Sequence, residues 1–170
     1  ENSFSYPDWR AIWQYVEAHF GRSEWNEVYR ELARIWLRQL REDLGGNYRC
    51  YESRDFVMLC AEGKAVAEKL TSSATNSLTA VAEALGPLMQ REMYGKHILL
   101  VFSEDDDYYS YISRYYPEGK HNLSAGVFVA AGYGHIAIPF TYVFPAKQII
   151  THELVHNCLA HLQIPRWLDE

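Results

Sequence analysis

The sequence predicts an α+β fold, in which a small mixed sheet packs against helices and a helical hairpin precedes the main domain. Apolar residues recur at helical spacing through the first 45 residues, and short apolar runs of strand length follow them. A longer apolar segment near the end carries the pattern His-Glu-x-x-His. A chain of 170 residues corresponds to one domain with a small appendage. We therefore expect residues 1–45 to form the hairpin and residues 46–170 to form the main domain.

Two helices are predicted at the start of the chain. Residues 7–20 carry an apolar stripe at helical spacing, and Gly21 ends it. Ser23 is expected to cap a second, longer helix, because a serine side chain accepts a hydrogen bond from the first turn. A pair of glycines at positions 45 and 46 ends this second helix.

The middle of the chain alternates between strands and helices. Residues 97–102 form a continuous apolar run, which is typical of a strand buried on both faces. Ser103 is expected to cap the following helix, and the acidic residues 104–107 favour its N-terminus. The other elements expected here are strands at 48–51 and 56–60, a helix over 63–91 with a break allowed at 71–79, and the helix that follows Ser103 through residue 115.

The last part of the chain is predicted to form a hairpin and then a helix. Apolar runs at 126–131 and 135–140 flank a Gly-Tyr-Gly turn, and Pro145 opens a helix that ends before Pro165. An exposed strand edge within 126–138 is expected to accept an extended peptide. Its candidate substrate-binding residues are Gly132, Tyr133 and His135, while a plain core hairpin with a structural His135 is the alternative.

Composition excludes some classes of function. The net charge is −6 and no block of Lys and Arg is present, so we expect no nucleic-acid partner. No apolar stretch reaches the length of about 18 residues that a membrane span needs. Cys50, Cys60 and Cys158 lack metal-site spacing and are expected to be buried free thiols, with a contact of Cys50 and Cys60 across a hairpin as the alternative.

The pattern at residues 152–156 is the main functional signal. His152 and His156 are four residues apart and therefore lie on one face of a helix, with Glu153 between them. Apolar residues on both sides of the motif indicate a buried helix, where two imidazoles and a carboxylate require partners such as a bound cation. We therefore predict that His152 and His156 bind Zn²⁺ and that Glu153 is a general base.

The third ligand is predicted beyond the motif helix. Leu159 and Leu162 occupy the positions where a metzincin would have Gly and His, and this excludes that class. His161 lies about 180° from His152 at 100° per residue and faces away. Glu170 is the candidate that remains, with Asp169 as the alternative.

The segments "HELVH" and "PRWLDE" resemble the gluzincin metallopeptidases, the thermolysin-like branch of the peptidase MA group. In that group a Trp-Leu-x-Glu segment supplies the third zinc ligand, which corresponds to Glu170. The order of strands and helices over residues 47–170 is also similar, and implies a zincin-like N-terminal subdomain. The family continues into a C-terminal helical subdomain, which we expect this chain to lack.

The resemblance implies a zinc-dependent peptidase that acts on a peptide or protein substrate. Three protein ligands leave zinc an open position for water, whose proton Glu153 takes before delivering it to the leaving amine. The alternative is a metal-stabilised protein-binding module with weak or absent turnover.

Overall fold

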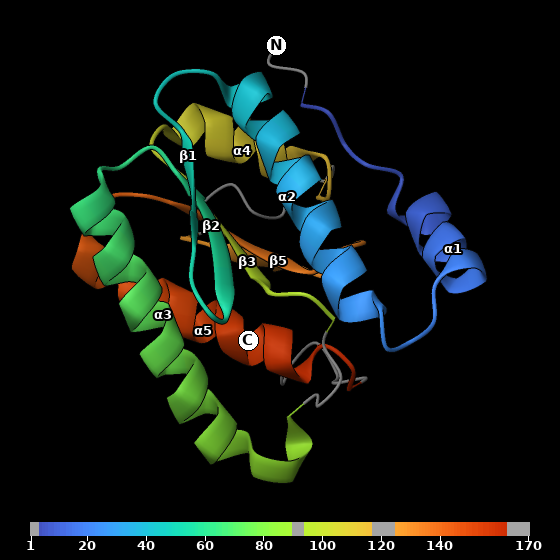
Figure 1. Ribbon diagram of the computed structural model, residues 1–170. Helices are drawn as coiled ribbons and strands as arrows, with labels where there is room; N and C mark the ends of the chain where they lie inside the picture. Colours follow the sequence, from blue (N-terminus) through green and yellow to red (C-terminus); the bar gives the residue numbers. More distant parts are fainter. Residues whose placement is uncertain (1–3, 90–93, 117–124, 163–170) are drawn as a thin grey trace.

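The computed structural model describes residues 4–89, 94–116 and 125–162, and it has three layers (Figure 1). One mixed five-stranded sheet lies between two layers of helices, in the strand order β1-β2-β3-β5-β4. Strands β2, β3 and β5 are parallel to one another, and β1 and β4 pair antiparallel at the two edges. The strands are β1 (Arg49–Glu52), β2 (Phe56–Cys60), β3 (His97–Phe102), β4 (Val127–Val129) and β5 (His135–Pro139).

The described residues form five α-helices, of which α2, α3, α4 and α5 pack against the sheet. The crossover from β2 to β3 runs through α3 on one face, and the crossover from β3 to β5 runs through α4 on the other. In Figure 1, α3 and α5 lie together on one side of the sheet, and α2 and α4 lie on the opposite side. The helices are α1 (Trp9–His19), α2 (Trp25–Leu44), α3 (Lys64–Leu85), α4 (Asp105–Ser113) and α5 (Val143–Leu159), with a short 3-10 helix at Gly86–Leu88.

The alternation of side chains along the central strands produces two hydrophobic cores. All six residues of β3 are buried, as the continuous apolar run predicted. Leu99 and Val101 point to the core under α3 and α5, whereas Leu100 and Phe102 point to the core under α2 and α4. The expected mixed sheet packed against helices is therefore confirmed.

Helix α2 covers one face of the sheet, and α1 packs beside α2 through the ring pairs Trp9–Trp36 and Trp13–Trp25. Val16 of α1 and Trp25 and Trp36 of α2 belong to the same hydrophobic cluster as Leu100 of β3.

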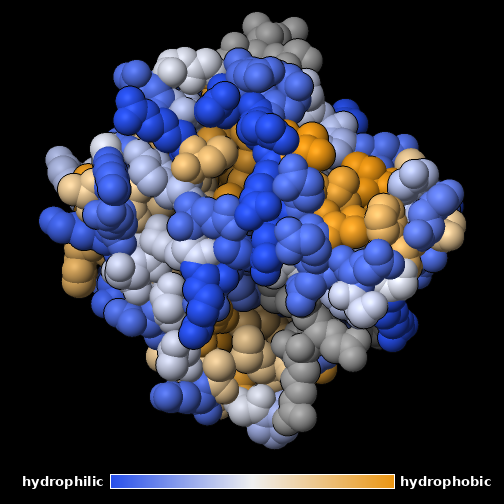
Figure 2. All heavy atoms as spheres, viewed as in Figure 1, coloured by the Kyte–Doolittle hydropathy of each residue, from blue (hydrophilic) through white to orange (hydrophobic). Residues whose placement is uncertain are grey.

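Figure 2 shows hydrophobic side chains at the surface between α1 and α2. Ile35 lines the hollow between these two helices and is half exposed. The outward side of α2 is charged and carries the ion pairs Arg30–Glu27 and Arg34–Glu31.

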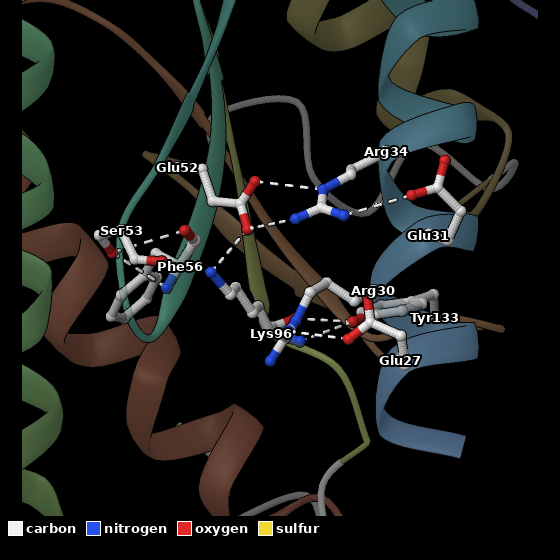
Figure 3. A network of polar contacts seen from close by, with 9 residues as sticks. All are labelled: Glu27, Arg30, Glu31, Arg34, Glu52, Ser53, Phe56, Lys96 and Tyr133. Atoms are coloured by element: carbon white, nitrogen blue, oxygen red, sulfur yellow. Dashed lines mark hydrogen bonds and ion pairs between the residues drawn. The ribbon is translucent and has the colours of Figure 1, made fainter. Parts of the chain in front are cut away.

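A polar network ties α2 to one end of the sheet (Figure 3). The Lys96 ammonium donates to Glu52 Oε1 at 2.6 Å and to the Ser53 carbonyl, and its side chain is almost fully buried. Arg34 of α2 makes a two-pronged contact with the same Glu52 carboxylate, with N···O distances of 3.0 and 3.2 Å. These contacts lower the pKa of Glu52, chiefly through the hydrogen bond from Arg34. The Tyr133 hydroxyl accepts a hydrogen bond from the backbone N–H of Lys96, which joins the β4–β5 loop to this network.

Several boundaries differ from those predicted. Ser23 and Ser103 are not N-caps, because α2 and α4 begin one residue later, after Glu24 and Glu104. The third helix is continuous through residues 71–79, since its small residues Ala67, Ala74 and Ser77 face the interior and pack closely. Cys50 is exposed rather than buried, while Cys60 and Cys158 are buried free thiols.

None of the helices in the described parts of the chain combines the length and the apolarity that a membrane crossing needs.

Candidate metal centre

Helix α5 places the motif at the edge of the sheet near β4. Its residues Ala146, Ile150 and Leu154 are spaced four apart and pack against β3 and β5. On the side that faces α3, the hydroxyl groups of Thr151 and Ser77 lie 2.6 Å apart. The helix is thus held on two sides, which fixes the direction in which the motif residues project.

The two motif histidines meet on the outer side of α5. Their Nε2 atoms are 3.0 Å apart, and their rings are nearly perpendicular, with centroids 4.6 Å apart. Two nitrogens bound to one zinc ion at 2.0–2.1 Å in tetrahedral geometry would be about 3.3 Å apart. The separation of His152 and His156 is therefore close to that of two ligands of one ion. A direct hydrogen bond between one protonated and one unprotonated Nε2 also accounts for the observed distance of 3.0 Å.

The premise that the whole motif is buried is wrong for the histidines. His152 is exposed and His156 is half-buried, while Glu153 is 7 % exposed. Helix α5 buries the side that faces the sheet and leaves the histidine side in solvent. Burial therefore demands a partner only for the carboxylate.

Glu153 has such a partner in the edge strand. Its Oε2 accepts a hydrogen bond from the backbone N–H of Phe128 in β4, with an N···O distance of 2.7 Å. The Phe128 carbonyl accepts the hydroxyl of Tyr116 at 3.3 Å. Side chains from α5 and from the segment that follows α4 thus contact both backbone groups of the central residue of β4. In the described part of the chain β4 pairs with β5 on one side and is an edge strand, as predicted within 126–138, whereas its acceptance of a peptide stays a prediction.

The predicted third ligand, Glu170, and its alternative, Asp169, lie outside the described residues. Within the described ranges 4–89, 94–116 and 125–162, no group of three or more His, Cys, Asp or Glu side chains is arranged to hold a metal. His161 is exposed just beyond the end of α5. Of the candidate centre, the structure therefore describes the two imidazoles of His152 and His156 and the carboxylate of Glu153.

His135 does not lie beside the motif histidines. It is completely buried on the face of the sheet that packs against α2 and α4, which is opposite to the face covered by α5. Its Nδ1–H donates to the Tyr133 carbonyl at 2.8 Å, and its Nε2 accepts from the Tyr111 hydroxyl at 2.8 Å. Burial lowers the pKa of His135 to about 4. These contacts correspond to the structural role that the sequence left open for this residue.

Gly132 and Tyr133 lie in the β4–β5 loop and line a cavity together with Phe128 and Asn157. Gly132 has a φ of +65°, and an added Cβ would lie 2.0 Å from Cδ1 of Trp9, so a side chain is excluded there. The Tyr133 hydroxyl donates to the Lys96 carbonyl at 2.8 Å, and burial raises its pKa to about 12. The loop is thus placed near the end of α5, but its polar groups are used within the protein.

One polar contact near the motif was not anticipated. Asn157 follows the second motif histidine, and its amide Nδ2 donates to Nδ1 of His97 at 2.9 Å across the interface between α5 and β3. Both side chains are buried, and burial lowers the pKa of His97 to about 4. An asparagine on the apolar side of a buried helix is the signal that predicts such a partner. Because 60 residues separate the two, local sequence patterns do not identify it.

Comparison of the chain with protein-family models, with curated proteins and with solved structures gave no significant match. The gluzincin resemblance therefore stays a prediction from the motif.

Proposed function

We propose that this chain is a zinc-dependent peptidase domain of the gluzincin type. The observation that supports the proposal most strongly is the arrangement of α5. It presents the Nε2 atoms of His152 and His156 3.0 Å apart, with the buried Glu153 carboxylate between them in sequence and an edge strand next to it. Glu170 is proposed as the third ligand.

The described donor set fits zinc. Neutral imidazole nitrogens are common zinc ligands, and two of them on one helical turn leave room for a carboxylate ligand and a solvent position. When bound, zinc would polarise the scissile carbonyl and activate a water molecule as the nucleophile.

Glu153 is proposed to move the proton. Its carboxylate would take a proton from the attacking water and deliver it to the leaving amine. The hydrogen bond from the Phe128 N–H holds this carboxylate beside the edge strand, and a peptide that pairs with β4 would replace this contact and free the carboxylate for the water. The substrate is proposed to be an extended peptide lying along β4, which is the edge nearest the motif.

One observation favours the alternative, a metal-stabilised binding module with little or no turnover. The Glu153 carboxylate is already hydrogen-bonded to the backbone of the strand along which a substrate would lie. If this contact persists when a peptide binds, Glu153 is a structural bridge between α5 and β4 and moves no proton.

Peptide cleavage by a Glu153→Gln variant distinguishes the two functions. The peptidase proposal expects a library of fluorogenic peptides to be cleaved by the parent protein in the presence of zinc. It expects a rate lower by about 10²–10⁴-fold in the variant, with zinc still bound. Glu83→Gln on the exposed surface of α3 is the matched control and should cleave normally. Equal rates for the parent and Glu153→Gln contradict the mechanism, and zinc binding without any cleavage by the parent favours the binding module.

A further inference from the structure

Phe128 is the residue of β4 whose backbone groups point away from β5. Residues of an antiparallel pair alternate between those that exchange hydrogen bonds with the neighbouring strand and those whose N–H and C=O point to the other side. Strand β4 has three residues, and its central residue Phe128 lies opposite Ile136 of β5. The N–H and C=O of Phe128 are bonded to side chains rather than to β5. They are therefore the donor and the acceptor that this edge offers to an added strand.

Two side chains of the protein already occupy this donor and this acceptor. Glu153 Oε2 accepts the Phe128 N–H at 2.7 Å, and the Tyr116 hydroxyl donates to the Phe128 carbonyl at 3.3 Å. The carboxylate oxygen stands in for the carbonyl oxygen of an added residue, and the hydroxyl stands in for its N–H. One residue of an antiparallel peptide makes the same two bonds, because the residues of a hydrogen-bonded pair exchange both. A peptide and these two side chains thus compete for the same backbone groups.

Close packing brings Glu153 within reach of β4. Gly126 lies just before the strand, and an added Cβ there would lie 2.3 Å from Cγ2 of Ile149 on α5. A side chain at this position is therefore excluded, which allows β4 to approach the helix that carries Glu153. The ring of Phe128 packs against the hydrophobic cluster under the same helix. The core thus fixes the separation of strand and helix, whereas the side chains of Glu153 and Tyr116 can rotate away from the strand.

The edge of β4 is protected by groups that a ligand can replace. An open strand edge is a template for pairing with other chains, and proteins commonly block it with a proline, a bulge or an inward-pointing charge. The outward groups of Phe128 are instead satisfied by two hydrogen bonds, one to a carboxylate and one from a neutral hydroxyl. The net contribution of such bonds is modest, so a peptide that replaces both and adds further contacts along its length is able to displace them.

We propose that Glu153 and Tyr116 form a cap on β4, an autoinhibitory contact that an extended peptide displaces. A carbonyl of the peptide accepts from the Phe128 N–H, and the N–H of the same residue donates to the Phe128 carbonyl. Glu153 leaves the strand in the same event, so its carboxylate reaches the candidate metal centre only while a peptide lies on β4. The release of a general base rests on the proposed function, whereas the competition between the cap and a peptide requires no cleavage.

Binding of an extended peptide in the absence of zinc tests the cap. The probe is fluorescein-labelled Thr-Val-Thr-Val-Thr amide, whose β-branched residues favour an extended chain, and its binding is measured by fluorescence anisotropy. Tyr116→Phe is expected to bind the probe about fivefold more tightly than the parent, and Glu153→Ala at least about tenfold, because each variant lacks a bond that the peptide must otherwise break. The same peptide with every amide nitrogen methylated cannot pair with the strand and should bind none of the three proteins.

The melting temperature separates a cap from a structural brace. If the two side chains only braced β4, removing either one would loosen the strand and weaken the binding of the probe. A cap predicts that Tyr116→Phe melts about 2–4 °C lower than the parent and yet binds the probe more tightly. Unchanged or weaker affinity in either variant, no binding by any of the proteins, or equal binding of the methylated peptide overturns the proposal.

Two matched variants serve as controls for the substitutions themselves. Tyr15→Phe alters an exposed tyrosine on α1, and Glu83→Ala alters an exposed glutamate on α3. Both should bind the probe with the affinity of the parent.

The cleavage assay described for the proposed function distinguishes the two possible failures. If both cap variants gain affinity and the parent cleaves no peptide with zinc present, the cap stands and the peptidase proposal fails. If the parent cleaves peptides and Glu153→Gln does not, but neither cap variant gains affinity, the cap fails and the peptidase proposal stands.

Discussion

Replacing Glu153 by alanine and by glutamine separates its structural role from its chemical role. In the structure, Glu153 Oε2 accepts the Phe128 N–H at 2.7 Å and joins α5 to the edge strand β4. A hydrogen bond to a charged group contributes about 1.5–3 kcal/mol, and a neutral one contributes about 1 kcal/mol. Glutamine keeps an oxygen acceptor at the same position, whereas alanine removes it and leaves the Phe128 N–H without this partner.

We therefore expect Glu153→Gln to lower the free energy of unfolding by about 1 kcal/mol and Glu153→Ala by at least about 2 kcal/mol. The higher helix propensity of alanine returns only a few tenths of a kcal/mol, roughly, and does not change the order. Equilibrium unfolding in urea at pH 7 measures both values, with Glu83→Gln and Glu83→Ala as controls on an exposed part of α3. If Glu153→Ala is as stable as the parent, or if the two Glu153 variants are equally stable, the contact with β4 does not hold the strand.

Three further predictions concern stability. Burial lowers the pKa of both His97 and His135 to about 4. The unfolded chain therefore binds more protons, and stability that is complete above pH about 6.5 should fall by about 3 kcal/mol per histidine as the pH is lowered to about 4, measured by urea unfolding. Lys96→Met should lower the free energy of unfolding by about 1–3 kcal/mol in the same assay, because it breaks a nearly buried ion pair. Gly132→Ala should cost more than Gly46→Ala, since both glycines have positive φ but only the first meets another side chain, and thermal melts should show a larger decrease for it.

Patterns within a segment predicted the elements that position the candidate site. The continuous apolar run at residues 97–102 predicted a strand with both faces covered, and β3 is buried throughout. The Gly-Tyr-Gly turn between two apolar runs predicted the hairpin that became β4 and β5. The apolar positions around His152 and His156 predicted α5, because helical spacing is set by the backbone alone.

Features that depend on which elements pack together were not predictable in the same way. The alternation of side chains along a strand predicts that His135 faces one side of the sheet. It does not predict which helices cover that side, and α5 lies on the other one. The contact of Glu153 with Phe128 and that of Asn157 with His97 join segments 25 and 60 residues apart. Such pairs follow from the order of the strands, which local periodicity does not encode.

Zinc uptake by the purified chain tests the assignment of His152 and His156 most directly. The measurement is a competition titration of zinc against a chromophoric chelator, on the parent and on His152→Ala. We predict about one zinc ion per chain for the parent and no uptake above background for the variant, because the remaining ligands hold zinc poorly. If the parent takes up no zinc, or if His152→Ala binds it with the affinity of the parent, the two histidines are not a metal site and their 3.0 Å separation is a hydrogen bond between imidazoles.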